Sequence, residues 1–261
     1  LSSRIEDNDD RAMIAGPEVW GKHFKNADGS RQSPIDIEPA SAVYEAALGA
    51  LSVSYSGADA KSISNSGHSF SVDYDDSGDS SAVLSGGPLA NPYKLKQFHF
   101  HWGASDAKGS EHTVDGKSYS AELHLVHWNA AKYASFDEAK DKSDGLAVLG
   151  AFVKVGANNA GLQKVTDALN AIADKGAKAD FKNYDPSVLL PKSLDFWSYL
   201  GSLTTPPLNE SAIWIVLKDP ISASKEQLAA FRSLKASDGS KLVCNFRPTQ
   251  PLKGRVVQAS F

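Results

Sequence analysis

Short stretches in which apolar and polar residues alternate fill much of the chain between residues 51 and 128. Alternation with a period of two is typical of β-strands that bury one face. Loops rich in Gly, Ser, Asp and Asn separate these stretches. We therefore predict short, mostly antiparallel strands joined by turns, and the stretches are 51–55, 70–74, 97–102 and 122–127.

Two further segments are almost continuously apolar. Residues 145–155 predict a strand that is buried on both faces, and residues 212–217 predict another strand. Only two segments have helical spacing. In the first, Leu162, Val165, Leu169 and Ile172 recur at intervals of three and four, and Gly176 follows the end. The second begins at Ser224 with Gln227 three residues later, which is a capping box.

These elements predict one α+β domain, built on a large, mostly antiparallel twisted central β-sheet with a few peripheral helices. We find no internal repeat and no linker. The expected division is an acidic N-terminal arm over residues 1–15 and a single globular domain over residues 16–261.

Composition narrows the function classes. The chain has 261 residues, of which 41% are hydrophobic and 22% charged, as is ordinary for a soluble globular protein. A net charge of −4 gives no electrostatic reason to expect nucleic acid as a partner. No apolar run approaches the roughly 20 residues of a membrane span. Cys244 is the only cysteine, so no internal disulfide forms, which favours a reducing compartment.

Two of the predicted strands carry histidines in a pattern that predicts a metal site. A strand sends alternate side chains to opposite faces, so Gln97, His99 and His101 share one face. In the other strand, Glu122 and His124 share a face by the same rule. If the strands are neighbours, three imidazoles converge, and three neutral nitrogen ligands with an open fourth position are typical of catalytic zinc. The amide and the carboxylate, each two residues before a histidine, would fix which ring nitrogen faces the metal.

The histidine spacing leaves another metal-binding fold open. In double-stranded barrels of the cupin kind, a His-x-His pair is followed closely by a glutamate and later by a histidine. Glu111 and His112 follow His101 at about that distance. A lone His-x-His pair is also compatible with a purely structural role, so the ligand spacing alone does not decide.

A rigid loop and one polar histidine are further candidates. Thr204 and Thr205 precede a double proline, which keeps this loop out of a central strand. One interpretation is that the loop serves only as a rigid structural turn. Alternatively, a threonine hydroxyl held in a fixed position can donate a hydrogen bond to a carboxylate such as Glu111. His68 lies among small polar residues, where contact with water would let a histidine titrate near neutrality.

Other notable residues are expected to be structural. His127 has the opposite parity to the candidate ligands and is expected in the core. His112 is expected to be a hydrogen-bonded structural histidine. Cys244 is expected to be buried and inert.

Five segments are specific enough to compare with known families. They are Gln97 to Gly103, Gly109 to Gly116, Ala121 to Asn129, Ser202 to Leu208 and Arg247 to Leu252. In this order, over a region from about residue 16 to the C-terminus, they resemble the α-class carbonic anhydrases of animals. The resemblance implies a Zn²⁺ cofactor and removes the cupin alternative.

The resemblance also implies a role for each matching residue. His99, His101 and His124 would be the zinc ligands, with Gln97 and Glu122 behind the first and the last. Thr204, donating to Glu111, would orient a zinc-bound hydroxide, and His68 would be the proton shuttle. The residues implied for the substrate pocket are Val126, Val148, Leu203, Thr205 and Trp214. Those implied for the water chain toward His68 are Asn65 and Ser71, again with Thr205. The pairs implied to have cis peptide bonds are Ser33-Pro34 and Pro206-Pro207.

The implied activity is the reversible hydration of carbon dioxide to bicarbonate and a proton, with weak esterase activity on the side. Sulfonamide-type and anionic inhibitors, a cytoplasmic location and a monomeric state are expected with it. The alternative is a catalytically silent carbonic-anhydrase-like interaction protein, as occurs where a zinc ligand is lost. All three candidate ligands are present, which favours the enzyme.

Departures from the family pattern occur near the expected shuttle. Ser66 and Ser71 stand where asparagines are common, and Asp9 to Met13 replace an aromatic segment that normally borders the shuttle. The first two changes are expected to widen and wet the pocket without abolishing activity. Secreted relatives carry a disulfide whose halves would fall at Ala27 and Asn209, so its absence favours the intracellular type.

Overall fold

The computed structural model describes residues 16–78 and 82–261 of the chain, so the predicted acidic arm, residues 1–15, lies outside the described residues. The strands of this part are β1 (Asp36–Ile37), β2 (Val43–Tyr44), β3 (Leu51–Ser54), β4 (Ala60–Asn65), β5 (Phe70–Tyr74), β6 (Val83–Gly86), β7 (Tyr93–Trp102), β8 (Thr113–Val114), β9 (Ala121–Trp128), β10 (Leu146–Val155), β11 (Lys178–Asp180), β12 (Phe196–Gly201), β13 (Ala212–Ala223) and β14 (Gln258–Ala259). The α-helices are α2 (Trp20–His23), α3 (Phe136–Ala139), α4 (Ala160–Ala168) and α5 (Lys225–Arg232).

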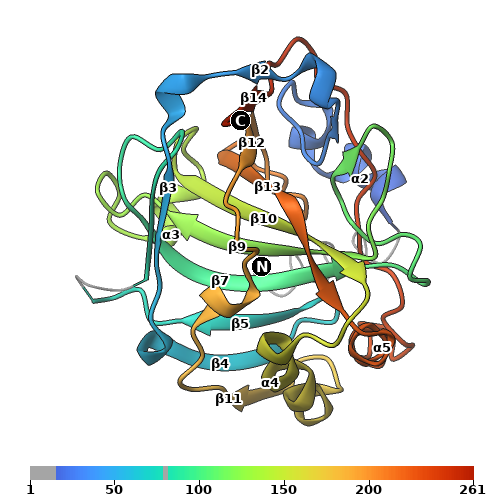
Figure 1. Ribbon diagram of the computed structural model, residues 1–261. Coiled ribbons are helices and arrows are strands. Elements are labelled where there is room, and N and C mark those ends of the chain that lie inside the picture. The colour runs from blue at the N-terminus through green and yellow to red at the C-terminus, as the bar shows by residue number, and fades with distance from the viewer. Residues whose placement is uncertain (1–15, 79–81) are drawn as a thin grey trace.

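One twisted sheet of 12 strands organises the described part of the chain (Figure 1). Its order is β11-β4-β5-β7-β9-β10-β13-β12-β14-β2, with β6 pairing both β3 and β7. Most neighbours are antiparallel, whereas β10 with β13 and β14 with β2 are parallel. The predicted α+β architecture on a large, mostly antiparallel sheet is therefore confirmed.

The helices are few and short, and α4 and α5 lie near one end of the sheet (Figure 1). The periodic segment 162–172 is helical, but its last turn, Leu169–Ile172, is a 3₁₀ turn. The capping box of α5 is present as predicted, with the Ser224 side chain accepting from Gln227 N and the Gln227 side chain accepting from Ser224 N. Both helices therefore start and stop close to where the sequence indicates.

Strand β10 is buried over its first eight residues, as its continuous apolar run predicts. It contributes to two hydrophobic clusters, one on each face of the sheet. The larger cluster contains Phe98, Phe100 and Trp102 of β7, whereas His99 and His101 point to the opposite face. One face of β7 is therefore core, and the other face is available for a site.

Candidate metal centre and active-site cavity

Strands β7 and β9 are antiparallel neighbours, and their register places His99 directly opposite His124. His101 lies on the same face of β7, so the three rings converge as the parity argument predicts. Their centroids are 5.0, 5.3 and 4.7 Å apart, and one nitrogen of each ring lies within 4.8 Å of the others. This geometry suits three ligands of a single ion.

A hydrogen-bond acceptor holds the outer nitrogen of each ring. Gln97 Oε1 lies 2.8 Å from His99 Nδ1, and Glu122 Oε1 lies 2.7 Å from His124 Nε2. The third acceptor is the main-chain oxygen of Asn245, 2.9 Å from His101 Nδ1. Because a neutral imidazole carries one proton, these contacts assign the proton to the outer nitrogen of each ring.

The inner nitrogens are therefore lone pairs that face one another. His99 Nε2 and His101 Nε2 lie only 3.1 Å apart, and neither has a proton to donate to the other. Two lone pairs at this distance repel unless a cation lies between them and the third nitrogen, His124 Nδ1. The donor set fits zinc, which takes three histidines in catalytic sites. A lone-pair trio held in this way is the strongest sign of a metal centre in the molecule.

Burial keeps His99 and His101 in the form that binds metal. Desolvation, followed by the repulsion of His101 and His124, lowers the pKa of His99 well below its ordinary value. Desolvation also lowers the pKa of His101, and the nearby Glu111 carboxylate only partly opposes it. His99 and His101 are therefore neutral at pH 7, as metal ligation requires.

The Glu122 carboxylate accepts several hydrogen bonds behind His124. It accepts from the main-chain N–H groups of Glu111 and His112, and it lies 2.7 Å from His112 Nδ1. Burial alone would raise the pKa of Glu122, but its electrostatic and hydrogen-bond contacts with His112 and His124 lower it well below its usual range. His112 Nε2 in turn lies 2.6 Å from the Tyr199 hydroxyl, so His112 is the structural histidine that the sequence predicts.

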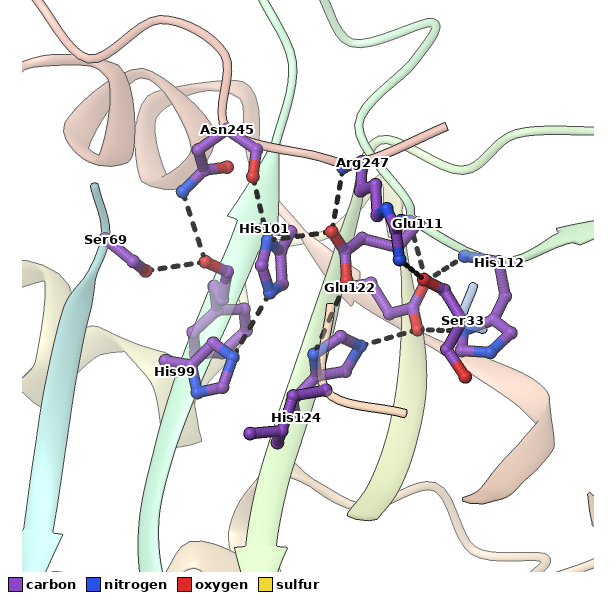
Figure 2. Close-up of polar contacts among 12 residues, drawn as sticks. Ser33, Ser69, His99, His101, Glu111, His112, Glu122, His124, Asn245 and Arg247 are labelled. Carbon is purple, nitrogen blue, oxygen red and sulfur yellow. Dashed lines mark hydrogen bonds and ion pairs between the residues drawn. The ribbon is translucent and has the colours of Figure 1, made fainter. Parts of the chain in front are cut away.

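Glu111 lies between the ligands and the C-terminal segment. Its Oε1 accepts from Arg247 N at 2.8 Å, whereas its Oε2 is buried and has no hydrogen-bond partner among the described residues. That orphaned oxygen lies 3.9 Å from His124 Nδ1, a suitable place for a negative charge beside a dication. The expected bond from Thr204 to Glu111 does not occur in the described part of the chain, although Thr204 is buried in the cavity wall. Figure 2 shows Glu111 beside His101 and His124.

A cavity of about 580 Å³ lies beside the histidines. Gln97, His99 and His101 line it, whereas His124 is buried and is not part of its described wall. The other predicted site residues in its wall are His68, Ser71, Thr204 and Thr205.

The residues expected to receive the substrate form an apolar cluster beside the metal centre. Val126, Val148 and Trp214 are buried together, with Leu203 packed against them. The Trp214 ring lies 4.8 Å from the His124 ring, centroid to centroid. None of these four side chains is part of the described cavity wall, so they lie behind the metal centre and do not line the cavity.

Two further expectations differ from the structure. Asn65 faces away from the cavity, because its side chain donates to Ala173 O and Lys235 O and accepts from Gly67 N. The neighbouring Ser66 lines the cavity instead. Cys244 is exposed at the cavity wall, since it lies in an irregular segment that crosses the cavity rather than in a packed strand.

Two other expectations hold. His127 is buried on the opposite face of β9, with Nε2 2.6 Å from the Tyr55 hydroxyl and Nδ1 3.2 Å from Ala147 O. The peptide bonds Ser33-Pro34 and Pro206-Pro207 are both cis.

The sheet, the three imidazoles that converge beside a cavity and the acidic group next to them define a zinc metalloenzyme. The chain belongs to the eukaryotic-type carbonic anhydrase family, whose model matches residues 15–261. It is 58% identical over 250 residues to Carbonic anhydrase 1 of Mus musculus and 55% identical over 250 residues to Carbonic anhydrase 1 of Monodelphis domestica. Each match covers 94% of this chain and 95% of the relative.

Family membership confirms the predicted class of enzyme, a zinc carbonic anhydrase that hydrates carbon dioxide, and the cupin alternative is wrong. None of the helices in the described ranges is long and apolar enough to cross a membrane.

Proposed function

We propose that His99, His101 and His124 hold the zinc ion with which this chain converts carbon dioxide and water into bicarbonate and a proton. The observation that carries this proposal is the trio of inward lone pairs, each fixed by an acceptor on the far side of its ring. When bound, zinc lowers the pKa of its water from 15.7 to about 7, an effect for which carbonic anhydrases are the reference case.

The chain keeps its ligands neutral and oriented. Gln97, Glu122 and the main-chain oxygen of Asn245 each hold one proton on the far side of a ring. Three neutral ligands leave the double positive charge of the cation uncancelled. The ionised Glu122 lies behind His124, so its charge acts through that ring rather than by direct ligation.

Thr204 and Glu111 orient the nucleophile in this proposal. With the nucleophile in place, Thr204 would accept a hydrogen bond from it and would donate one to Glu111 Oε2, so that a lone pair of the nucleophile would face the substrate carbon. Two observations support these roles: the Glu111 oxygen is buried without a partner among the described residues, and Thr204 lines the cavity. The Arg247 N–H bond to the other carboxylate oxygen keeps that side of Glu111 occupied.

Carbon dioxide is placed beside the apolar cluster that packs behind the metal centre. Because carbon dioxide has no net dipole, the side chains of Val126, Val148, Leu203 and Trp214 offer it an apolar wall without competing hydrogen bonds. Thr205 adds one hydroxyl at the cavity wall. Bicarbonate is charged, is poorly matched to this wall and leaves toward water.

His68 carries the product proton out. It lines the same cavity as His99 and His101 and is partly exposed, and an imidazole can accept a proton at one ring nitrogen and release one from the other. Hydroxyl groups of Ser66, Ser71 and Thr205 line the space that waters of a relay would fill.

Further properties belong to the same proposal. Sulfonamide-type and anionic inhibitors are expected to bind at the cation, and activated esters are expected to be hydrolysed slowly. The site is built within one chain, which supports a monomer. The single cysteine supports a cytoplasmic location, because reducing compartments do not favour disulfides.

The test is metal removal and reloading. We expect about one zinc per chain, loss of carbon dioxide hydration after treatment with a chelator, and recovery on adding zinc, measured by stopped flow with a pH indicator. Acetazolamide, a sulfonamide, should abolish the recovered rate. A folded protein that binds no zinc, or that binds zinc without a rate above buffer, would instead favour the catalytically silent interaction protein.

A further inference from the structure

Asn245 contacts the ligand strand through its main chain. It lies outside any regular element, beside the end of β7. Its N–H donates to Trp102 O at 3.1 Å, and its carbonyl oxygen accepts from His101 Nδ1 at 2.9 Å. The main chain at this position therefore fixes one ligand ring.

The Asn245 side chain makes three more contacts. Its Oδ1 accepts from Trp102 N at 2.7 Å, which assigns the orientation of the amide because a main-chain N–H can only donate. Its Nδ2 donates to His68 O at 2.9 Å and to Phe100 O at 3.4 Å. Figure 2 shows Asn245 next to His101, with Ser69 approaching the ligand strand from the other side.

These contacts continue the sheet where its strand pairing stops. Pairing of β5 with β7 ends at Ser71 and His99. Beyond that pair, Phe100 O accepts from Ser69 Oγ at 2.7 Å as well as from Asn245, and Trp102 N donates to Asn245. Two side chains thus hold the main chain on both sides of His101 in place of a neighbouring strand.

The loop that carries His68 packs against the segment that precedes Asn245. Gly67 has φ +84°, and a Cβ built there would lie 2.5 Å from Ser237 Oγ, so the close approach requires glycine. Ser237 N donates to Gly67 O at 3.2 Å, and the buried Asn65 side chain reaches Lys235 O. Two described contacts join this loop to the ligand strand: Asn245 Nδ2, which binds both His68 O and Phe100 O, and Ser69 Oγ, which donates to Phe100 O.

We propose that Asn245 is a positioning residue whose side chain fixes the His68 loop relative to the strand of His99 and His101. The inference rests on the proposed function, because it takes His68 as the proton shuttle. Proton transfer through waters depends on the separation of its end points, and a misplacement of about 1 Å can cost on the order of a hundredfold in rate. Asn245 acts through the main chain of His68 and does not touch the substrate.

Two variants separate the contacts. Asn245→Asp keeps an acceptor for Trp102 N but brings a carboxylate oxygen against two carbonyl oxygens. Asn245→Leu is uncharged, is similar in size and loses all side-chain hydrogen bonds. An effect common to both variants therefore follows from the lost donor and not from a new charge. Cys244→Ser is the matched control, since this exposed neighbour makes none of the contacts described above.

The kinetic readout is a split between kcat and kcat/KM for carbon dioxide hydration by the zinc-loaded protein in dilute buffer. We expect kcat to fall about tenfold in both Asn245 variants, because proton release is slowed, with kcat/KM within about twofold of the parent. Imidazole in solution should restore kcat by accepting the proton directly. Added to His68→Ala, either substitution should lower kcat no further.

Amide hydrogen exchange gives a readout that needs no activity. In both variants, with and without zinc, the amides of residues 66–69 should exchange faster than in the parent, because their loop loses an anchor. The amide of Trp102 should exchange faster in Asn245→Leu and stay protected in Asn245→Asp, which retains the acceptor. Cys244→Ser should match the parent in both measurements.

An unchanged kcat in both variants overturns the inference. So does an equal fall of kcat and kcat/KM, or a loss of kcat that persists in the His68→Ala background. If His68→Ala alone keeps the parent kcat, the shuttle assignment fails first and the inference fails with it. If His68→Ala lowers kcat but the Asn245 variants do not, the inference fails alone.

Discussion

His124 and His127 lie three residues apart on β9, and both are buried, but their hydrogen bonds give them different chemistry. Both nitrogens of His127 are satisfied, one by the Tyr55 hydroxyl and the other by Ala147 O. His124 uses one nitrogen for Glu122 and keeps the other as a lone pair facing His99 and His101. His124 is the candidate ligand because one of its nitrogens is left without a protein donor.

This difference predicts opposite results for two alanine substitutions. His124→Ala should lower zinc affinity by well over a hundredfold, since loss of a hydrogen-bond partner behind a ligand alone costs about 10–100-fold. His127→Ala should leave zinc affinity near that of the parent and lower the free energy of unfolding by about 2–4 kcal/mol, because it leaves a cavity and an unpaired Tyr55 hydroxyl. Competition with a chromophoric chelator measures the first quantity, and urea unfolding measures the second. Equal zinc loss in both variants would overturn the assignment by strand parity.

At this scale the sequence predicts side chains better than main-chain groups. Parity alone brings His99, His101 and His124 together, with Gln97 and Glu122 behind them. The third acceptor, the carbonyl oxygen of Asn245, has no signature in sequence, because every residue carries one. Its only possible signal is the Asn245 side chain, whose contacts depend on a loop 177 residues away along the chain.

Neighbouring residues with similar chemistry are also hard to separate from sequence. Asn65 and Ser66 are both small and polar, and only the fold decides which one lines the cavity. From its residue type, Cys244 is predicted to be a buried thiol. The segment around it runs along the cavity wall instead and leaves it exposed. Residue type predicts burial only where a regular element fixes the direction of the side chain.

Strand β7 works as an element with two different faces. Behind the ligands, Phe100 and Trp102 pack against Phe231 of α5, with ring centroids 5.0 and 5.3 Å apart, and Phe70 of β5 closes the same group at 5.3 Å. Helix α5 therefore supports the ligand strand from its core side. The capping box fixes where this helix begins and so where Phe231 lies.

Substitution of Phe231 tests that support. Phe231→Ala should lower the free energy of unfolding by about 3–5 kcal/mol, because a fully buried ring leaves a cavity. Phe231→Leu should cost much less, about 1–2 kcal/mol, since most of the volume is kept. Denaturant unfolding of the metal-free protein measures both. An alanine variant as stable as the leucine variant would show that α5 does not support the strand.

The sequence predicts where a strand exists more easily than it predicts which strands pair. The alternating and continuous apolar runs locate β5, β7, β9, β10 and the start of β13. The parallel pairing of β10 with β13 joins segments that are far apart in the chain, and no periodicity encodes it. The two-residue strands β1, β2, β8 and β14 are too short to show a pattern, and tertiary contacts create them.

For the whole molecule, a large sheet covered on both faces means that some titratable groups fold into places without water. His127 is the clearest case, because burial lowers its pKa from 6.5 to about 4 while its hydrogen bonds only partly oppose the shift. Its Nε2 faces the Tyr55 hydroxyl, whose own pKa burial raises well above its usual range. The pair is therefore neutral in the folded protein throughout the physiological range.

This burial predicts how stability depends on pH. Above pH 6.5, His127 is neutral in both the folded and the unfolded chain, and its contribution is complete. Between pH 6.5 and about 4 the unfolded chain binds a proton that the folded chain excludes, so stability falls as the pH falls. The shift corresponds to about 3 kcal/mol at about 1.36 kcal/mol per pH unit.

Since His127→Ala removes the titrating group, the gap in unfolding free energy between parent and variant should shrink by about that amount from pH 7 to pH 4. Urea unfolding of the metal-free proteins across this range measures the gap, and using metal-free protein removes the separate effect of zinc loss in acid. A gap that stays constant with pH would mean that His127 is protonated as readily in the fold as in the unfolded chain, against the solvent-free contacts with Tyr55 and Ala147.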